Sequence, residues 1–360
     1  MRTVALCLLI LAGILLRVQI LRNLPREVAV CTADFAAFYA GGKLAGSPNM
    51  YSPAAVFAVE KEAMGCYLEN IIYIKPPFYA LLMWPLAQLP YLTAFTLWRV
   101  LCLFAVAAFL WMWPGDRLVA AAACAWFLPL ATNFTTGQDV AFVLVAFLGA
   151  YRLLKAGRGF WAGVVFGLCA VKFHLFVLLP LLLVRRRLWR TMLGGAATLA
   201  VFFTASFFAC GPQWIRQYRL ALTDPRMNPS PGNMVNLNGL FHYQAAWVVP
   251  ATVVVIGACG YLVWKGSLEA ALAAVLTGGV LCVPHNTISD GTLLLPVLLL
   301  AQLSHSMPMR ALALFAITPL YRFLPGGTLQ VALLAMVAIE VWTMVRRTPG
   351  ALQEPAGTTT

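Results

Sequence analysis

Two ionisable side chains near the beginning of this sequence have the residue types and the setting that a chemical reaction requires. Asp34 lies in Ala33-Asp34-Phe35, just after the first hydrophobic segment, in a chain with only 12 Asp and Glu among 360 residues. Lys75 follows on the same long loop, before Pro76-Pro77. A carboxylate can act as a general base toward a hydroxyl group, and a lysine can bind a phosphate as a point charge. The pair indicates a reaction centre at one side of a membrane.

Asp34 and Lys75 also have simpler structural interpretations, which the sequence leaves open. Asp34 precedes an apolar run that can begin a helix, and Asp is a preferred N-cap residue. Lys75 can extend its ammonium group to lipid headgroups while its stem stays in apolar surroundings. In the catalytic interpretation, the neighbouring Tyr73 supplies an apolar contact to the lipid or the sugar of a substrate.

Three further basic side chains are candidates for binding the same phosphate. Lys172 and His174 stand between two apolar half-spans, where burial of an ammonium group costs several kcal/mol. A bound lipid phosphate would offset that cost, although His174 can equally be a hydrogen-bonded core histidine. His285 lies beside a break at a membrane surface and can donate a hydrogen bond to a phosphate or to an acceptor hydroxyl.

Polar residues between the apolar runs are expected to bind the hydroxyl groups of a sugar or an acceptor. They are Asn133, Gln138, Asn236, Asn238 and Asp290. Ordinary connecting loops explain these residues almost as well. No His-x-x-x-His or paired-carboxylate spacing supports a metal site, and the Gly-Gly pairs lack the strand-loop-helix setting of a nucleotide site. We therefore expect no metal and no other cofactor.

The composition of the chain places these residues in a membrane protein. Hydrophobic residues make up 62% of the sequence and charged residues 10%, whereas a soluble domain has roughly 25% charged residues. The net charge of +13 comes mostly from short clusters of Lys and Arg between apolar runs, as in the cytoplasmic loops of membrane proteins. Membrane lipids are therefore expected partners, and nucleic acid is not.

The apolar segments predict an all-α integral membrane protein with ten to twelve transmembrane helices. A span needs roughly 20 apolar residues, or somewhat fewer where the bilayer thins. The candidates are residues 4–21, 92–112, 117–131, 139–154, 159–171, 173–184, 191–210, 246–264, 268–284, 291–304, 309–321 and 328–345. The count varies because short neighbours such as 159–171 and 173–184 can form one long span.

The segment 78–89 decides on which side of the membrane the polar residues lie. It is apolar but bounded and cut by prolines, so we expect a helix in the membrane interface rather than a span. With that assignment, the cationic connections between later spans fall on one side, which the positive-inside rule makes cytoplasmic. Asp34 and most other unusual polar residues then face the extracytoplasmic side of the cell's inner (plasma) membrane.

These assignments predict one membrane-embedded domain over residues 1–345 and a disordered cytoplasmic tail over 346–360. The domain contains two extracytoplasmic loops, at 22–91, with juxtamembrane helices, and at 211–245. Cys31 and Cys66 share the first loop, where they can form a disulfide or remain free.

Several short motifs follow one another in a characteristic order. Ala33-Asp34-Phe35 with Tyr39 and Tyr51 precedes Tyr73-x-Lys75-Pro76-Pro77-Phe78 and Pro85-Leu86-Ala87-x-Leu89-Pro90. Further along come Pro129-x-x-x-Asn133 with Gly137-Gln138, a lone Lys172, Asn236-x-Asn238-Gly239, and Pro284-His285 with Asp290. Over most of residues 30–300, this pattern resembles glycosyltransferase family 87. It departs from the family at Asn238, where Ser is common, and near Asp290, where Tyr is frequent.

The resemblance implies an integral membrane enzyme of the type C glycosyltransferase fold that needs no metal. Such an enzyme transfers a sugar, mannose or a similar one, from a polyprenyl phosphate. The resemblance thus implies a transfer that inverts the anomeric centre, to a lipid or cell-envelope glycan acceptor on the extracytoplasmic face. It also implies that Asp34 is the catalytic base and that Lys75, Lys172 and His285 lie near the donor phosphate.

Two alternatives to a transferase remain open. One is a transporter or flippase of polyprenyl lipids or glycolipids without transferase activity, for which matching broken spans in two halves are expected. The sequence contains no convincing repeat of that kind. The other is a non-catalytic assembly subunit, in which Asp34 is only a helix cap.

Overall fold

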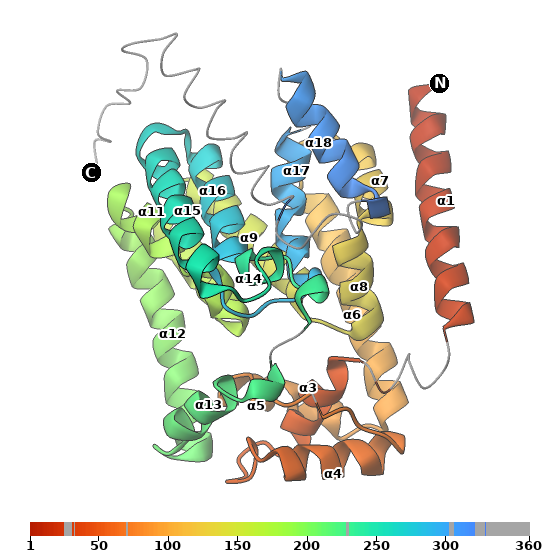
Figure 1. The fold of residues 1–360 in the computed structure, drawn as a ribbon, viewed down its shortest axis with the longest axis vertical. Coiled ribbons are helices and arrows are strands. Elements are labelled where there is room, and N and C mark those ends of the chain that lie inside the picture. The colour runs from red at the N-terminus through yellow and green to blue at the C-terminus, as the bar shows by residue number, and fades with distance from the viewer. Residues whose placement is uncertain are drawn as a thin grey trace. The chain divides into compact units, whose positions relative to one another are not determined.

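The computed structural model describes residues 1–24, 31, 33–69, 71–227, 230–301, 306–320 and 328, and every regular element in them is a helix (Figure 1). The predicted all-α class is therefore confirmed for this part of the chain. The predicted tail at 346–360 and, apart from residue 328, the predicted span at 328–345 lie outside the described residues. The chain separates into two compact units, which we describe one at a time. The predicted boundaries of a single domain stay a prediction.

Five helices in the described residues are long and apolar enough to cross a membrane. They are α1 (Arg2–Asn23), α6 (Tyr91–Met112), the segment Gly159–Phe176, α12 (Trp189–Cys210) and α15 (Ala245–Lys265). The helices α7 (Arg117–Trp126) and α8 (Leu128–Thr136) form a sixth candidate that is bent by 63°. The chain is thus consistent with a membrane protein.

The predicted count of ten to twelve spans is not confirmed, because several predicted spans form shorter helices. These are α9 (Val140–Lys155), α16 (Leu268–Cys282), the segment Ile288–Ala301 and α18 (Met307–Ile317). An α-helix rises 1.5 Å per residue. Even the longest of them, α9 with 16 residues, therefore falls short of the roughly 30 Å of a bilayer core unless the bilayer thins around it.

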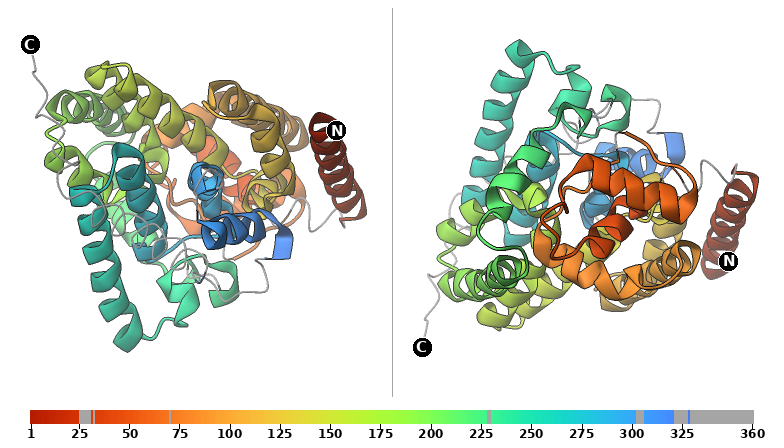
Figure 2. Two further views of the ribbon diagram at one scale, coloured as in Figure 1. Left: turned by 90° about the horizontal axis from the view of Figure 1, so that it is seen from above. Right: turned by 90° about the horizontal axis from the view of Figure 1, so that it is seen from below.

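The first unit comprises Met1–Phe173, Arg190–Pro229 and Ile288–Leu293. Of the helices already given, it contains α1, α6, α7, α8, α9 and, from Arg190 on, α12. It also contains α3 (Phe35–Lys43), α4 (Pro53–Met64), α5 (Pro77–Ala87), α10 (Gly159–Leu168), α13 (Trp214–Leu222) and the 3-10 turn η2 (Pro225–Met227). The turn η1 (Cys169–Phe176) begins in this unit, as does η4 (Ile288–Leu294). Helices α3, α4, α5 and α13 gather at one end of the unit (Figures 1 and 2).

An aromatic cluster fixes α3 against α6 in the first unit. The ring of Phe35 stacks on Phe95 with the centroids 5.0 Å apart, and it also contacts Tyr91 and Trp98 at 5.7 and 5.9 Å. Burial of such large rings contributes most of the packing energy of a core. Because Phe35 is fully buried, the cluster determines where the preceding residue, Asp34, can lie.

Helix α5 forms where the sequence predicted an interfacial helix at 78–89. Its buried side packs on α3, whose Gly41 and Gly42 leave room for the ring of Tyr73 and the carbonyl of Met83. Its other side exposes Leu82 and Trp84. Eleven residues are too few for a span, and an apolar exposed side suits a membrane surface. Its position relative to a bilayer stays a prediction.

Helix α1 is attached to the first unit through α7 (Figure 2). The indole nitrogen of Trp126 donates to the carbonyl of Leu9 at 3.0 Å, and Arg17 donates to the carbonyl of Trp126 at 3.0 Å. Of the residues of α1, only Gly13 is buried, and it faces Ala125. The rest of the helix presents the apolar surface that a lipid-facing span requires.

Helices α10 and α12 cross so closely that glycine is required on both. A Cβ at Gly163 would collide with the carbonyl of Thr191, and one at Gly194 with the carbonyl of Phe160. Small residues at helix contacts let backbones approach in membrane proteins. The crossing fixes the end of α10, after which the chain reaches Lys172.

Replacing Gly163 with Ala should lower the melting temperature of the protein in detergent. The methyl group forces the two backbones apart, which typically costs about 1–3 kcal/mol. The matched control is Gly257→Ala in α15, where nothing lies within 4 Å of the added Cβ. That variant should melt no lower than the wild type, and equal melting of the two variants would contradict the close crossing.

The second unit comprises His174–Trp189, Ser230–Thr287 and Leu294–Thr360. Its remaining elements are α11 (Leu179–Arg185), η3 (Pro231–Asn233), α14 (Leu237–Leu240) and α17 (Leu295–Ala301). Helices α15 and α16 pack side by side, and the hydroxyl of Ser267 caps α16 by accepting from the amide of Ala270. Residues 271–281 of α16 are all buried, so this helix forms the centre of the unit.

Candidate functional site

Asp34 occupies the N-cap position of α3 but does not cap the helix with its side chain. The capping interpretation of this residue is therefore wrong as far as its carboxylate is concerned. The carboxylate instead forms hydrogen bonds with the side chains of Thr136 and Gln138. Asp34 is only partly buried, although the residues on both sides of it are buried. The side chain of Asp34 is therefore held by the turn that contains Thr136 and Gln138.

The turn between α8 and α9 carries Thr136 and Gln138, the two residues that hold Asp34. Gly137 ends α8 with φ of 71°, and a Cβ there would collide with the side chains of Phe35 and Phe95. The carbonyl of Gly137 accepts from the indole of Trp98 at 2.7 Å. The side-chain oxygen of Asn133 accepts from the amide of Val140 at 3.0 Å. The turn is thus fixed by packing and by hydrogen bonds from α6 and α8.

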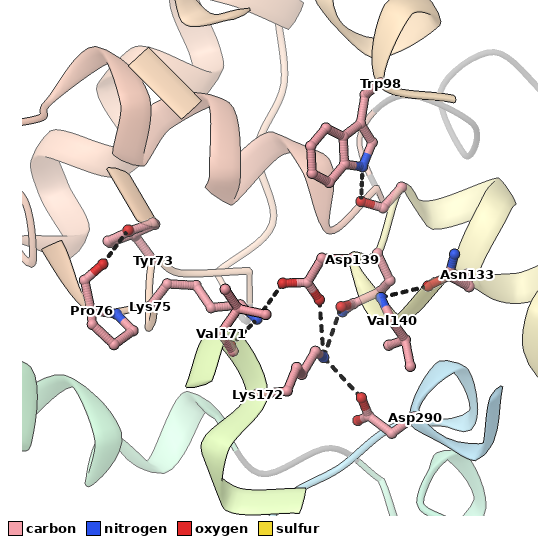
Figure 3. Close-up of polar contacts among 12 residues, drawn as sticks. Tyr73, Lys75, Pro76, Trp98, Asn133, Asp139, Val140, Val171, Lys172 and Asp290 are labelled. Atoms are coloured by element: carbon pink, nitrogen blue, oxygen red, sulfur yellow. Dashed lines mark hydrogen bonds and ion pairs between the residues drawn. The ribbon is translucent and has the colours of Figure 1, made fainter. Parts of the chain in front are cut away.

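Next to this turn, two lysines and two aspartates form a buried ion-pair network (Figure 3). Lys75 Nζ lies 2.7 Å from Asp139 Oδ2, and Lys172 Nζ lies 2.8 Å from Asp290 Oδ1. Lys172 Nζ is also 3.7 Å from Asp139 Oδ1, which joins the two pairs. All four side chains are at most 8% exposed. The charges of this network therefore balance within it.

A break in the helical segment Gly159–Phe176 makes this network possible. Lys172 has the non-helical angles φ −134° and ψ 42°, which turn its side chain out of the helical path. The carbonyl of Val171, just before the break, accepts from Lys75 Nζ at 2.9 Å. Lys172 Nζ donates in turn to Gln138 Oε1 at 2.9 Å. Because the oxygen of Gln138 is engaged by Lys172, its amide nitrogen remains to donate to Asp34.

Of the predicted phosphate-binding residues, Lys75 and Lys172 are brought together, and each is already paired with a carboxylate. Tyr73 is buried, and its hydroxyl donates to the carbonyl of Pro76 at 3.1 Å. Burial lowers the pKa of the Lys75 ammonium to about 8, whereas the charge of Asp139 acts in the opposite direction. The predicted roles of these residues at a donor phosphate stay predictions.

His174 and His285 belong to the second unit, where both are partly buried. Their predicted roles at a donor phosphate stay predictions.

The predicted hydroxyl-binding amides of the second unit have mainly backbone partners. Asn236 is fully buried, donates to the carbonyl of Val283 at 2.8 Å and accepts from the amide of Gly239 at 2.9 Å. Asn238 donates to the carbonyl of Pro284 at 2.8 Å. Such contacts tie the loop 234–239 to the end of α16. In the first unit, Asn133 and Gln138 support the turn beside Asp34, and Asp290 is part of the ion-pair network.

Sequence reasoning missed two charged residues close to this site. Arg99 lies inside α6 and donates to the carbonyl of Thr135 at 2.8 Å. Glu60 on α4 is 1% exposed, and neither of its carboxylate oxygens has a hydrogen-bond partner among the described residues. Burial raises the pKa of Glu60 to about 8. A charged residue within the predicted span 92–112 was the signal that would have identified Arg99.

Cys31 and Cys66 form a disulfide in the structure, which decides a question that the sequence left open. The bond links the chain three residues before Asp34 to the region that follows α4, across 35 residues. Closing a loop of this length restricts the unfolded chain and typically stabilises the folded state. The disulfide therefore anchors the segment that leads into α3.

Taken together, the apolar helices and the polar site define a helical membrane protein with a partly exposed carboxylate beside a buried charge network. The model of glycosyltransferase family 87 matches residues 73–284, which is more than half of the chain. The protein therefore belongs to glycosyltransferase family 87, and it acts as a glycosyltransferase with a sugar donor and an acceptor. Searches among curated proteins and among solved structures give no match. The matched segment includes Lys75 and Lys172 but not Asp34.

Proposed function

We propose that the protein transfers a sugar, mannose or a similar hexose, from a polyprenyl phosphate to a lipid or cell-envelope glycan acceptor, with inversion at the anomeric carbon. The observation that carries the proposal is the carboxylate of Asp34, which does not cap its helix and is held by Thr136 and Gln138. An inverting displacement needs one base and no covalent intermediate. Asp34 meets that requirement, because it is a single carboxylate outside the ion-pair network, whose own charges balance.

In the proposed reaction, the hydroxyl oxygen of the acceptor attacks the anomeric carbon of the sugar. The bond from this carbon to the phosphate oxygen breaks, and the polyprenyl phosphate leaves with the electron pair. Asp34 takes the proton of the hydroxyl group as the new bond forms. No redox change and no further reactant are involved, so the step needs only the donor, the acceptor and the base.

The surroundings of Asp34 suit a general base. Burial raises the pKa of its carboxyl group, and the hydrogen bonds of Thr136 and Gln138 and the charge of Lys172 lower it in part. A base is most effective when its pKa approaches the working pH while it remains mostly ionised. Transfer should therefore decline as the pH falls through this raised pKa, because the protonated carboxyl cannot accept a proton.

The donor class can be tested directly with membranes that contain the protein. Radiolabelled polyprenyl-phosphate mannose, polyprenyl-phosphate glucose and GDP-mannose are supplied separately with a lipid extract as acceptor source. We expect label in a new glycan or glycolipid from a polyprenyl-linked donor only. Transfer from GDP-mannose in membranes free of polyprenyl phosphate would refute the proposed donor.

We further propose that Asp34 faces the extracytoplasmic side of the plasma membrane. The disulfide Cys31–Cys66 supports this side, since disulfides persist in oxidising compartments. The positive-inside rule supports it independently, because Arg185, Arg186 and Arg187 then lie in the cytoplasm.

Cysteine labelling tests the sidedness in whole cells, after the exposed native Cys7 has been replaced. Ser47→Cys and Asn233→Cys should react with an impermeant maleimide, whereas Arg187→Cys should react only after the membrane is opened. Asn233 and Arg187 are both exposed on the protein, so a difference between them reports the side and not the burial. Labelling of position 187 in intact cells would contradict the proposed side of the membrane.

A further inference from the structure

We propose that Arg99 binds the phosphate group of the polyprenyl lipid at this site. The inference rests on the proposed function, because it names the residue that holds the donor lipid of that reaction. It starts from the charges of the site. Lys75 and Lys172 are neutralised by Asp139 and Asp290, and an ionised Asp34 adds a negative charge. A phosphate at this site therefore requires a cation outside the network.

Arg99 is such a cation. Its carbon Cζ lies 3.8 Å from the ring centroid of Phe95, and its Nη2 donates to the carbonyl of Thr135. Among the described residues, it has no ion-pair partner, and its Nε is buried without a hydrogen-bond partner. A charge within a membrane span is costly, and it usually pairs or faces a ligand pathway. Arg99 has no such ion pair within the part of the chain that the structure describes.

Arg99 contacts the same turn as the proposed base. It contacts the turn at Thr135, and Asp34 is held by Thr136 and Gln138 of the same turn. Phe95, on which the guanidinium group lies, stacks on Phe35, the residue next to Asp34. The hydroxyl of Tyr91 interacts electrostatically with both Arg99 and Asp34. Base and cation therefore border the same region of the first unit.

The chemistry of arginine matches the leaving group of the proposed reaction. The guanidinium group offers five N–H donors in a planar fork that fits two phosphate oxygens at once. Within the described residues, one nitrogen of Arg99, Nη2, has a hydrogen-bond partner. Arg99 is neither fully buried nor fully exposed, so a lipid phosphate at the surface of α6 can reach it. The charge that builds up on the phosphate as the sugar leaves would be stabilised there.

The test measures the affinity of a polyprenyl monophosphate for the purified protein in neutral phosphatidylcholine nanodiscs. Arg99→Gln should weaken binding about ten- to hundredfold, the effect of losing one or two charge-assisted hydrogen bonds. Arg99→Lys should give an intermediate loss, because it keeps the charge but not the fork. The matched control is Arg152→Gln, since Arg152 also donates to a single backbone carbonyl, that of Met112. It should bind like the wild type.

Melting temperatures and a second lipid separate the other outcomes. If Arg99→Gln binds like the wild type, or if it unfolds while Arg99→Lys binds normally, Arg99 only clamps the turn and the inference is overturned. Equal, Arg99-dependent binding of phosphatidic acid would assign the residue to bulk phospholipid and overturn the assignment to the donor lipid. Failure of both variants to fold would also make Arg99 a structural residue and overturn it.

The outcome is distinguishable from that of the proposed function. Arg99-dependent binding of polyprenyl phosphate without sugar transfer from any polyprenyl-linked donor would leave the inference standing and refute the function. Sugar transfer from a polyprenyl-linked donor, with lipid binding that does not depend on Arg99, would support the function and refute the inference.

Discussion

Replacing Asp34 with Asn should reduce sugar transfer by about 10²–10⁴-fold, the usual effect of removing a general base. The amide keeps the size of the side chain but cannot accept the proton of the acceptor hydroxyl. Donor binding should change little, because the base acts on the acceptor. The measurement is the transfer rate from a radiolabelled polyprenyl-phosphate sugar in membranes that contain equal amounts of wild-type and variant protein.

The stability of the Asn variant should not fall, which separates loss of the base from loss of the fold. Burial raises the pKa of Asp34, so the folded state disfavours the ionised carboxylate above the ordinary pKa of Asp. At neutral pH, Asp34→Asn should therefore melt at the wild-type temperature or higher.

The matched control is Asp116→Asn, because Asp116 caps α7 by accepting from the amides of Leu118 and Val119. A loss of this cap affects stability and should leave the transfer rate unchanged. Wild-type turnover by Asp34→Asn would show that the carboxylate of Asp34 is not the base.

Replacing Lys172 with Met should have the largest effect on stability, a loss of about 3–5 kcal/mol. The substitution removes the ammonium group that lies 2.8 Å from Asp290, and it takes away one of the two lysines near Asp139. Removing one member of a buried ion pair is strongly destabilising. Thermal melting in detergent measures the loss, and specific activity is then compared for the folded fraction only.

The double variant Lys172→Met with Asp290→Asn separates an ion pair from a phosphate-binding lysine. Removing both charges should restore much of the stability that the single substitution loses. Arg226→Gln is the control for an exposed pair, with Asp224, and should leave the melting temperature nearly unchanged. If Lys172→Met is stable but binds polyprenyl phosphate more weakly, Lys172 contacts the donor and the pair with Asp290 is secondary.

Much of the fold could be predicted because hydropathy and helix signals are local. The apolar run at 92–112 became α6 and the run at 246–264 became α15, in both cases within a residue or two. The number of spans could not be predicted in this way. Hydropathy placed two apolar half-spans on either side of Lys172 but left open whether they form one span. The break at Lys172 depends on the partners that its side chain finds.

The sequence alone determined that this is a helical membrane protein and that Asp34, Lys75 and Lys172 are unusual in it, because a charged residue in apolar surroundings stands out in any linear pattern. Only the tertiary structure decided what these residues contact. Lys172 and Asp290 are 118 positions apart, and Lys75 and Asp139 are 64 apart. Which lysine meets which carboxylate, and that Arg99 meets none among the described residues, depends on how separate helices pack, because electrostatic energies follow distance in space and not along the chain.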